Sequence, residues 1–371
     1  MTTDELSRLT QAVLWGAFLL AALLGALVQR TGFCTMGAVS DAVLLGSWTR
    51  LRQWALATGT AMAGFAGLVA LGWLRPDQTL YASTRWLWLS ALSGGLLFGF
   101  GMVLSSGCVS KTLVRVGAGN LKALVVLLVA ALSGFATLKG LTAVLRSLTV
   151  DRVGVGFGVN ADLGSLAAAA GGFSPAAGGV ALGLLGALAL AAWALREPEL
   201  RSGWGLGAGL GVGLLVLGMW VLTGHVGHLQ EHPETLEQAW LATNSTRAEG
   251  FSFIAPSAFA LDWLLFFSDA KKHLTVGIVS VAGVVAGSAA VALARRQFRW
   301  EGFASTGDLG HHLAGGLLMG VGGVTAMGCS IGQGVTGVST LSLTSLTAAA
   351  AMVAGAVAGV RYQAWRLDRA A

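Results

Sequence analysis

The chain has 371 residues, of which 11% are charged and 55% are hydrophobic, and its formal net charge is +6. A typical soluble domain has about 25% charged residues, so this chain lacks the charge needed to cover a water-facing surface. Glycine is abundant, with 55 residues, but the 5 prolines and the absence of a Gly-x-y period exclude collagen. The composition predicts an all-α integral membrane protein. Its basic residues are scattered through short gaps, which indicates membrane topology rather than nucleic-acid binding.

Taken in chain order, the apolar runs predict about nine membrane-spanning helices, since a span needs about 20 mostly apolar residues. The first run, 12–28, follows acidic residues instead of the positive segment of a secretory signal, so we interpret it as a retained span. The last run, 313–360, contains no charge and is long enough for two spans. The other predicted spans lie at 53–74, 86–106, 121–138, 176–195, 203–224 and 274–294.

Four segments between the spans are predicted to be short helices or loops that do not cross the membrane. Residues 34–48 and 252–268 are short apolar pieces interrupted by Asp or Pro, while 107–120 and 328–343 are rich in Gly, Ser and Thr. Irregular backbone at membrane depth is tolerated only inside protein or along a wet cavity. Ordinary polar loops are the alternative interpretation of these segments.

The distribution of Lys and Arg predicts the orientation. With the N-terminus outside, 14 of the 23 basic residues fall on the cytoplasmic side and 9 on the other. Cytoplasmic loops carry the excess of Lys and Arg. We therefore expect a multi-pass protein with a periplasmic N-terminus and a cytoplasmic C-terminus.

An internal repeat relates the two halves of the chain. Residues 94–108 and 315–329 match at nine of fifteen positions at a constant offset of 221, and both blocks end in Gly-Cys. A weaker match, at an offset of 218, relates Gly32-Phe33-Cys34 to Gly250-Phe251-Ser252. In the expected topology the halves are inverted, as in many secondary transporters whose sites lie at broken helices near the midplane. Duplication retained for packing alone is the alternative. The boundaries are a first repeat at about 1–138, a connecting insert at about 139–202 and a second repeat at about 203–371.

All 3 cysteines lie in segments with glycine before them and Ser, Thr or Gln after them. A short helix that starts after such a segment directs free N–H groups and a positive dipole end at its first residues, which favours an anion. No acidic cluster for a cation path is present, apart from Asp41. A thiol is a polarisable, weak donor suited to a soft, sulfur-bearing anion, although a lone membrane cysteine usually serves packing. The predicted substrate-binding residues are Cys34, Cys108, Cys329, Gly107, Gly328, Ser110, Ser330, Gln333 and Ser252.

Other motifs carry less weight. The alternating glycines at 205–213 lie in an apolar span and indicate helix packing, and no Walker A motif indicates ATP coupling. His225, His228 and His232 fit a solvated outer loop better than a metal site, and His311 and His312 are adjacent rather than spaced for a shared ligand set. We predict no metal, no cofactor and no enzymatic activity.

With these motifs, Gly-Phe-Cys at 32–34, the paired Gly-Cys segments, and Gly250-Phe251-Ser252 with Pro256, the chain resembles the YeeE/YedE family of sulfur-transport membrane proteins. The resemblance covers essentially the whole chain. It implies thiosulfate uptake across the bacterial inner membrane, nine spans plus short non-spanning helices in an inverted pair, and functional cysteines at Cys34, Cys108 and Cys329. It also implies a small cytosolic sulfur carrier of the TusA type, here as a separate chain. The insert at 139–175 departs from the pattern.

The predicted function is therefore an inner-membrane permease that imports thiosulfate or a similar soft sulfur anion past three cysteines. Transport of a selenium-containing or other sulfur species is an open alternative, because some family relatives are linked to selenium metabolism. A membrane thiol oxidoreductase is the rival from another class, although no Cys-x-x-Cys pair supports it.

Overall fold

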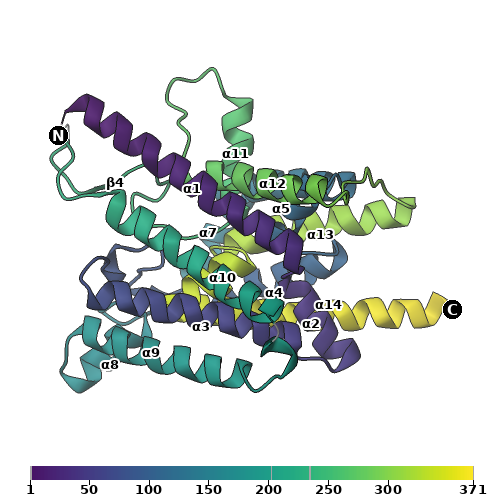
Figure 1. Ribbon diagram of the computed structural model, residues 1–371, viewed down its shortest axis with the longest axis horizontal. Helices are drawn as coiled ribbons and strands as arrows, with labels where there is room; N and C mark the ends of the chain where they lie inside the picture. Colours follow the sequence, from purple (N-terminus) through teal and green to yellow (C-terminus); the bar gives the residue numbers. More distant parts are fainter. Residues whose placement is uncertain (1, 202, 234, 371) are drawn as a thin grey trace.

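The computed structural model describes residues 2–201, 203–233 and 235–370, and its structure is predominantly helical (Figure 1). In chain order the helices are α1 (Thr3–Thr31), α2 (Thr35–Ser40), α3 (Thr49–Ala70), α4 (Trp88–Leu104), α5 (Val109–Gly117), α6 (Leu121–Lys139), α7 (Leu141–Leu148), α8 (Leu163–Gly171), α9 (Pro175–Ala194), α10 (Gly203–Val221), α11 (Ile254–Leu265), α12 (Val276–Ala294), α13 (Thr306–Thr325) and α14 (Leu343–Ala370). Short 3₁₀ or π-helical turns are η1 (Asp41–Leu45), η2 (Pro76–Gln78), η3 (Val150–Arg152), η4 (Glu199–Arg201), η5 (Leu222–Val226) and η6 (Gly332–Gly337). Two antiparallel strand pairs complete the described chain: β1 (Arg85–Trp86) with β2 (Val155–Gly156), and β3 (His228–Leu229) with β4 (Ala239–Trp240).

Seven helical segments in the described part of the chain are long and apolar enough to cross a membrane. They contain α1, α4, α6, α9, α10, α12 and α14. Helices α3 and α13 also match predicted spans and have 22 and 20 residues, but they are not among the seven. The chain is thus a multi-pass helical membrane protein, and the count of nine spans stays a prediction.

The outer surfaces of the spanning helices carry large apolar side chains. Leu185 and Leu188 of α9 are 62% and 69% exposed, and Leu132 of α6 and Leu214 of α10 are also exposed. Contiguous apolar surface of this kind is costly in water. In a membrane, lipid acyl chains cover it.

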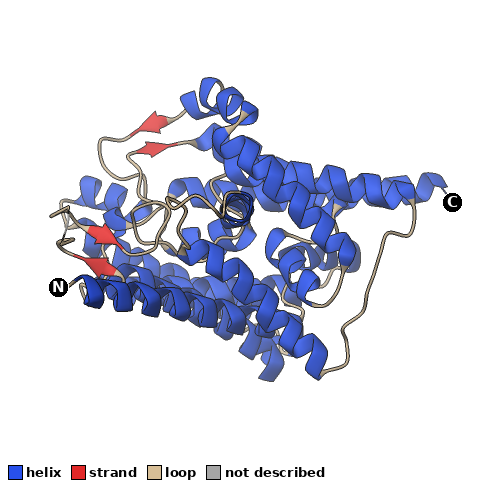
Figure 2. Cartoon of the chain, turned by 90° about the horizontal axis from the view of Figure 1, so that it is seen from above, coloured by secondary structure: helices blue, strands red, loops and turns tan. Residues whose placement is uncertain are grey.

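Helix α1 begins well before its apolar run because the sequence supplies a capping box. The Thr2 side chain accepts the Glu5 N–H, and the Glu5 carboxylate accepts the Thr2 N–H. At the other end Gly32 adopts a left-handed conformation at φ 69° and ends the helix just before Cys34. The N- and C-termini lie at opposite ends of the molecule (Figure 1). Figure 2 shows both strand pairs toward the N-terminal end.

Close backbone contacts through glycine hold α4 between α13 and α14. A Cβ on Gly94 would lie 2.4 Å from the backbone nitrogen of Ala326, and one on Gly101 would lie 2.8 Å from the carbonyl oxygen of Gly315. The start of α4 therefore meets the end of α13, and the end of α4 meets the start of α13. The two helices that end in the repeated Gly-Cys segments run antiparallel in direct contact.

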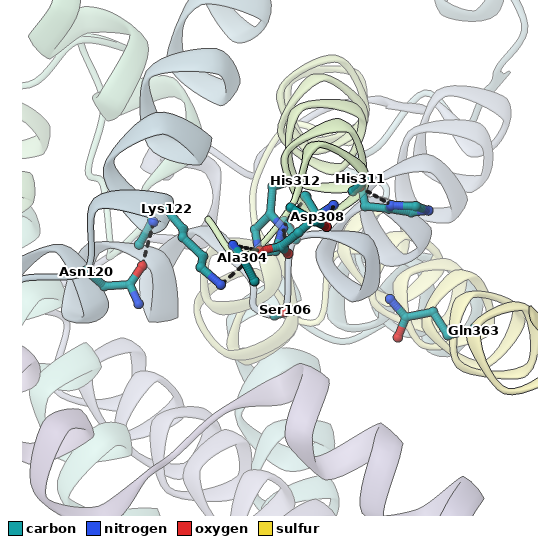
Figure 3. Close-up of polar contacts among 12 residues, drawn as sticks. Ser106, Asn120, Lys122, Ala304, Asp308, His311, His312 and Gln363 are labelled. Carbon is teal, nitrogen blue, oxygen red and sulfur yellow. Dashed lines mark hydrogen bonds and ion pairs between the residues drawn. The ribbon is translucent and has the colours of Figure 1, made fainter. Parts of the chain in front are cut away.

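A polar cluster joins the first turns of α6 and α13 (Figure 3). Lys122 Nζ lies 2.9 Å from Asp308 Oδ2, and His312 Nδ1 lies 3.0 Å from Asp308 Oδ1. His311 instead contacts Arg366 of α14. The two adjacent histidines therefore contact different helices.

Candidate functional site

The segments that follow α4 and α13 share one backbone geometry. Ser106 and Met327, which lie 221 residues apart, both adopt left-handed conformations, at φ 59° and φ 61°. In each segment the next residue, Gly107 or Gly328, donates its N–H to the carbonyl five residues earlier at 2.8 Å. Left-handed backbone is uncommon outside glycine, so the coincidence shows that the sequence repeat specifies one local structure.

Each of the three cysteines stands at the start of a short helix. The Cys34 sulfur caps α2 by accepting the Gly37 N–H at 3.5 Å, and the Cys329 sulfur accepts the Gly332 N–H at 3.4 Å. Cys108 is the residue immediately before α5. Such positions expose N–H groups without intrahelical partners. The Gly-Cys pattern thus places every thiol where a helix is interrupted.

The structure brings the thiols of Cys34 and Cys108 together. Their side chains lie near each other, although 74 residues separate them in the chain. The Cys108 sulfur also lies 3.2 Å from the Ser110 hydroxyl, and Ser330 stands beside it from the second half. Cys329, in the second half of the chain, is fully buried. All three side chains are free thiols.

Two buried polar atoms at this centre lack hydrogen-bond partners within the described residues. They are the Ser330 hydroxyl and the Gln333 side-chain oxygen, on residues that are 2% and 1% exposed. The Gln333 amide nitrogen, by contrast, donates to the Ala326 carbonyl at 2.6 Å. An unsatisfied buried polar group costs about 1–3 kcal/mol. A bound polar ligand is one way to recover that cost.

Two further predicted residues, Ser252 and Gly328, pack against the segment that follows Cys329. Ser252 packs against Gly332, where a Cβ would lie 2.6 Å from the Ser252 hydroxyl oxygen. A Cβ on Gly328 would lie 3.0 Å from Gln333 Cγ. Ser252 therefore contacts the segment after Cys329.

A cavity of about 290 Å³ opens beside the Cys329 segment. Its wall includes two predicted residues, Ser252 and Gly328, together with Arg146 and Glu249. Arg146 belongs to α7 of the connecting insert and pairs with Asp151 at 3.1 Å. The insert, which the sequence left without a role, thus supplies the cation of this cavity wall.

Sequence reasoning missed three side chains near the centre. Tyr81 donates its hydroxyl to the Gly332 carbonyl at 2.5 Å, and Trp54 donates to the Thr35 hydroxyl at 3.1 Å. Lys111 is the third residue of α5, one helical turn after Cys108. The sequence could have indicated Lys111, because it lies three residues after a cysteine. No sequence pattern indicated Tyr81 or Trp54.

His225 and His228 pack on aromatic rings. His225 stacks on Trp73 at a centroid distance of 4.5 Å, and His228 stacks on Trp240 at 4.9 Å. Among the residues that the structure describes, no group of three or more His, Cys, Asp or Glu side chains is placed to hold a metal ion.

Spanning helices around a buried centre of thiols and hydroxyls define a multi-pass membrane protein. The chain belongs to the sulphur transport family, whose model matches residues 30–358. It is 27% identical over 326 residues to the thiosulfate transporter TsuA of Escherichia coli (strain K12), covering 85% of this chain and 84% of that protein. It is 28% identical over 357 residues to the thiosulfate transporter TsuA of Spirochaeta thermophila, covering 92% and 97%. The family and these relatives are transporters rather than enzymes, as the sequence predicted.

Proposed function

We propose that the protein is an inner-membrane permease that imports thiosulfate, or a similar soft sulfur anion, along a path lined by Cys329, Cys108 and Cys34. The observation that carries this proposal is the buried Cys108 sulfur, 3.2 Å from the Ser110 hydroxyl, together with the Ser330 hydroxyl that has no hydrogen-bond partner among the described residues. The names of the two relatives support thiosulfate as the substrate.

The proposed mechanism needs no covalent chemistry. A thiol is a weak hydrogen-bond donor with a polarisable sulfur, so each cysteine holds the sulfur end of the anion loosely. The hydroxyls of Ser110 and Ser330 donate to its oxygens. Weak successive sites suit conduction, because an ion must both enter and leave each of them.

The proposed topology sets which end of the path faces the periplasm and which faces the cytoplasm. The N-terminus is periplasmic and the C-terminus cytoplasmic, with α3 and α13 as the second and eighth of nine spans in chain order. The cavity beside Ser252 and Gly328 is then the outer entrance, Cys329 is the outermost thiol and Cys34 the innermost. The antiparallel contact of α4 and α13 supports an inverted relation between the repeats 1–138 and 203–371. A TusA-like carrier is the proposed cytosolic acceptor.

Uptake of radiolabelled thiosulfate by cells that lack other routes tests the function, with sulfate and selenium oxyanions as competitors. We expect saturable thiosulfate uptake that sulfate inhibits weakly. Stronger inhibition by a selenium oxyanion than by unlabelled thiosulfate would reassign the substrate. A cytoplasmic signal from a reporter fused to the C-terminus tests the orientation, and a periplasmic signal there would overturn it.

The contact between Cys34 and Cys108 also supports one rival function, a membrane thiol oxidoreductase. Such an enzyme cycles its cysteines between thiol and disulfide. Thiol labelling during turnover separates the two functions: a permease keeps both thiols free, whereas an oxidoreductase shows a disulfide that appears and disappears with substrate.

A further inference from the structure

Lys111 places a positive charge next to the Cys34–Cys108 pair. It is the third residue of α5, the helix that begins after Cys108, and it is half-buried. Its aliphatic stem lies against Gly107, where a Cβ would meet Lys111 Cγ at 3.4 Å. Residues three apart on a helix lie on the same face, and Lys111 comes three residues after Cys108 at the start of α5. Its charge therefore lies close to the Cys34–Cys108 pair.

The Lys111 side chain has no hydrogen bond and no ion pair to another described residue. Lys122, on the next helix, differs in this respect because it pairs with Asp308 at 2.9 Å (Figure 3). Burying a charge away from water is costly unless the charge is paired. A half-buried lysine with no carboxylate partner is therefore a place where an anion is favoured.

The surroundings of Lys111 increase its positive potential. Arg50 and Arg115 both act electrostatically on Lys111. The Arg50 guanidinium lies 3.3 Å from Asp41, which neutralises one of these charges, and Arg115 donates to the Ser106 carbonyl at 3.3 Å. Three cations and one carboxylate therefore leave an excess positive charge on this side of the thiol pair. Clefts lined by one sign of charge concentrate ions of the opposite sign.

We propose that Lys111 is the residue that selects doubly charged anions, by supplying the counter-charge for an anion held at the Cys34–Cys108 pair. This inference rests on the proposed transport function. The terminal sulfur of the anion contacts the thiols, and the oxygens of its sulfonate end contact the ammonium group. Lysine suits the role because its charge is compact and its stem is flexible, so it holds the anion without a fixed bidentate geometry and releases it. In partly dehydrated surroundings the charge acts more strongly than it does in water.

The test is the concentration dependence of thiosulfate uptake by proteoliposomes that contain the purified full chain. Lys111→Met keeps the stem length and removes the charge, Lys111→Arg keeps the charge, and Lys122→Met is the matched control because Asp308 already neutralises that lysine. Thiocyanate, a soft anion with one charge, is the competitor. For Lys111→Met we expect a rise in KM of at least tenfold and stronger inhibition by thiocyanate relative to the parent. Lys111→Arg restores most of the parental KM, and Lys122→Met leaves it unchanged.

The outcomes separate this inference from the proposed function. Parental protein that takes up no thiosulfate overturns the proposed function. Parental uptake together with an unchanged KM and unchanged thiocyanate inhibition in Lys111→Met overturns the role of Lys111 alone. If Lys111→Met does not insert in the membrane, Lys111→Gln provides the same comparison, with the amount of inserted protein measured for every variant. A lower maximal rate at an unchanged KM also contradicts the inference, because a purely structural role gives that result.

Discussion

Replacing Cys108 by Ala is the sharpest perturbation of the proposed path. Cys108 is 1% exposed, and its sulfur lies 3.2 Å from the Ser110 hydroxyl. The substitution removes one buried sulfur atom, a loss comparable to a single core methylene, which costs about 0.5–1.5 kcal/mol of stability. The folded protein should therefore still insert in the membrane.

The expected loss of function is larger than the loss of stability. A hydrogen bond to a charged group contributes about 1.5–3 kcal/mol, and about 1.4 kcal/mol corresponds to a factor of ten in affinity. We therefore expect Cys108→Ala to weaken apparent affinity for thiosulfate about 10- to 100-fold. Initial uptake rates over a range of thiosulfate concentrations, normalised to inserted protein, measure this change.

Ser93→Ala is the matched control for this prediction. It removes a similar polar atom from α4, the helix that leads to Cys108, and the Ser93 hydroxyl only donates to its own helix at the Leu89 carbonyl. Its uptake should equal that of the parent. If Cys108→Ala and Cys329→Ala both transport at the parental rate, the thiols are packing residues and the reasoning is refuted.

Three further predictions use other features of the structure. Cys34→Ser should retain part of the uptake activity, since the second half carries a serine at the matching place; complete loss in a well-inserted variant would contradict the equivalence of the two segments. Ser330→Ala should leave the melting temperature of the substrate-free protein unchanged or higher, because its hydroxyl has no hydrogen-bond partner among the described residues, while thiosulfate affinity falls. Unchanged affinity would remove Ser330 from the site. Gly287→Ala should destabilise the protein by about 1–3 kcal/mol, because its Cβ would lie 1.8 Å from the Ala22 carbonyl oxygen, while Gly67→Ala, which meets nothing within 4 Å, serves as the control in thermal unfolding. Equal melting temperatures for these two glycine variants would contradict the close contact of α1 and α12.

The repeat was the most informative feature of the sequence. Its Gly-Cys blocks correspond in the structure to the matching left-handed turns at Ser106 and Met327. Local backbone geometry follows from local sequence, because a turn is specified by its own few residues. The positions of the helix ends were predicted less accurately than the turns of the repeat. Helix α1 starts nine residues before its apolar run, since the Thr2–Glu5 capping box extends the helix through polar residues.

Contacts between distant segments were beyond what the sequence pattern alone could predict. The meeting of Cys34 with Cys108 depends on how α2 folds back after Gly32 and on how α5 leaves α4. These geometries are set by packing of the whole helix bundle and not by the residues beside each cysteine. The position of Lys111 could not be predicted either. In the sequence it is one basic residue of a loop, and only the fold places it near the thiols.

Apolar runs in the sequence are an incomplete guide to which helices span the membrane. Helix α13 begins at Thr306, and near its start Asp308 pairs with both His312 and Lys122. Polar residues that satisfy one another at the end of a helix lower its average hydropathy without preventing a crossing. For this reason the nine-span prediction is tested better by reporter fusions than by composition.

The most direct test of the central claim is an experimental structure of the protein with thiosulfate bound. We expect density for the anion beside Cys108, with its terminal sulfur in contact with the Cys34 and Cys108 thiols and its oxygens near Ser330 and Lys111. Density confined to the cavity beside Arg146, or to the protein surface, with the thiol pair still in direct contact, would contradict the cysteine-lined path.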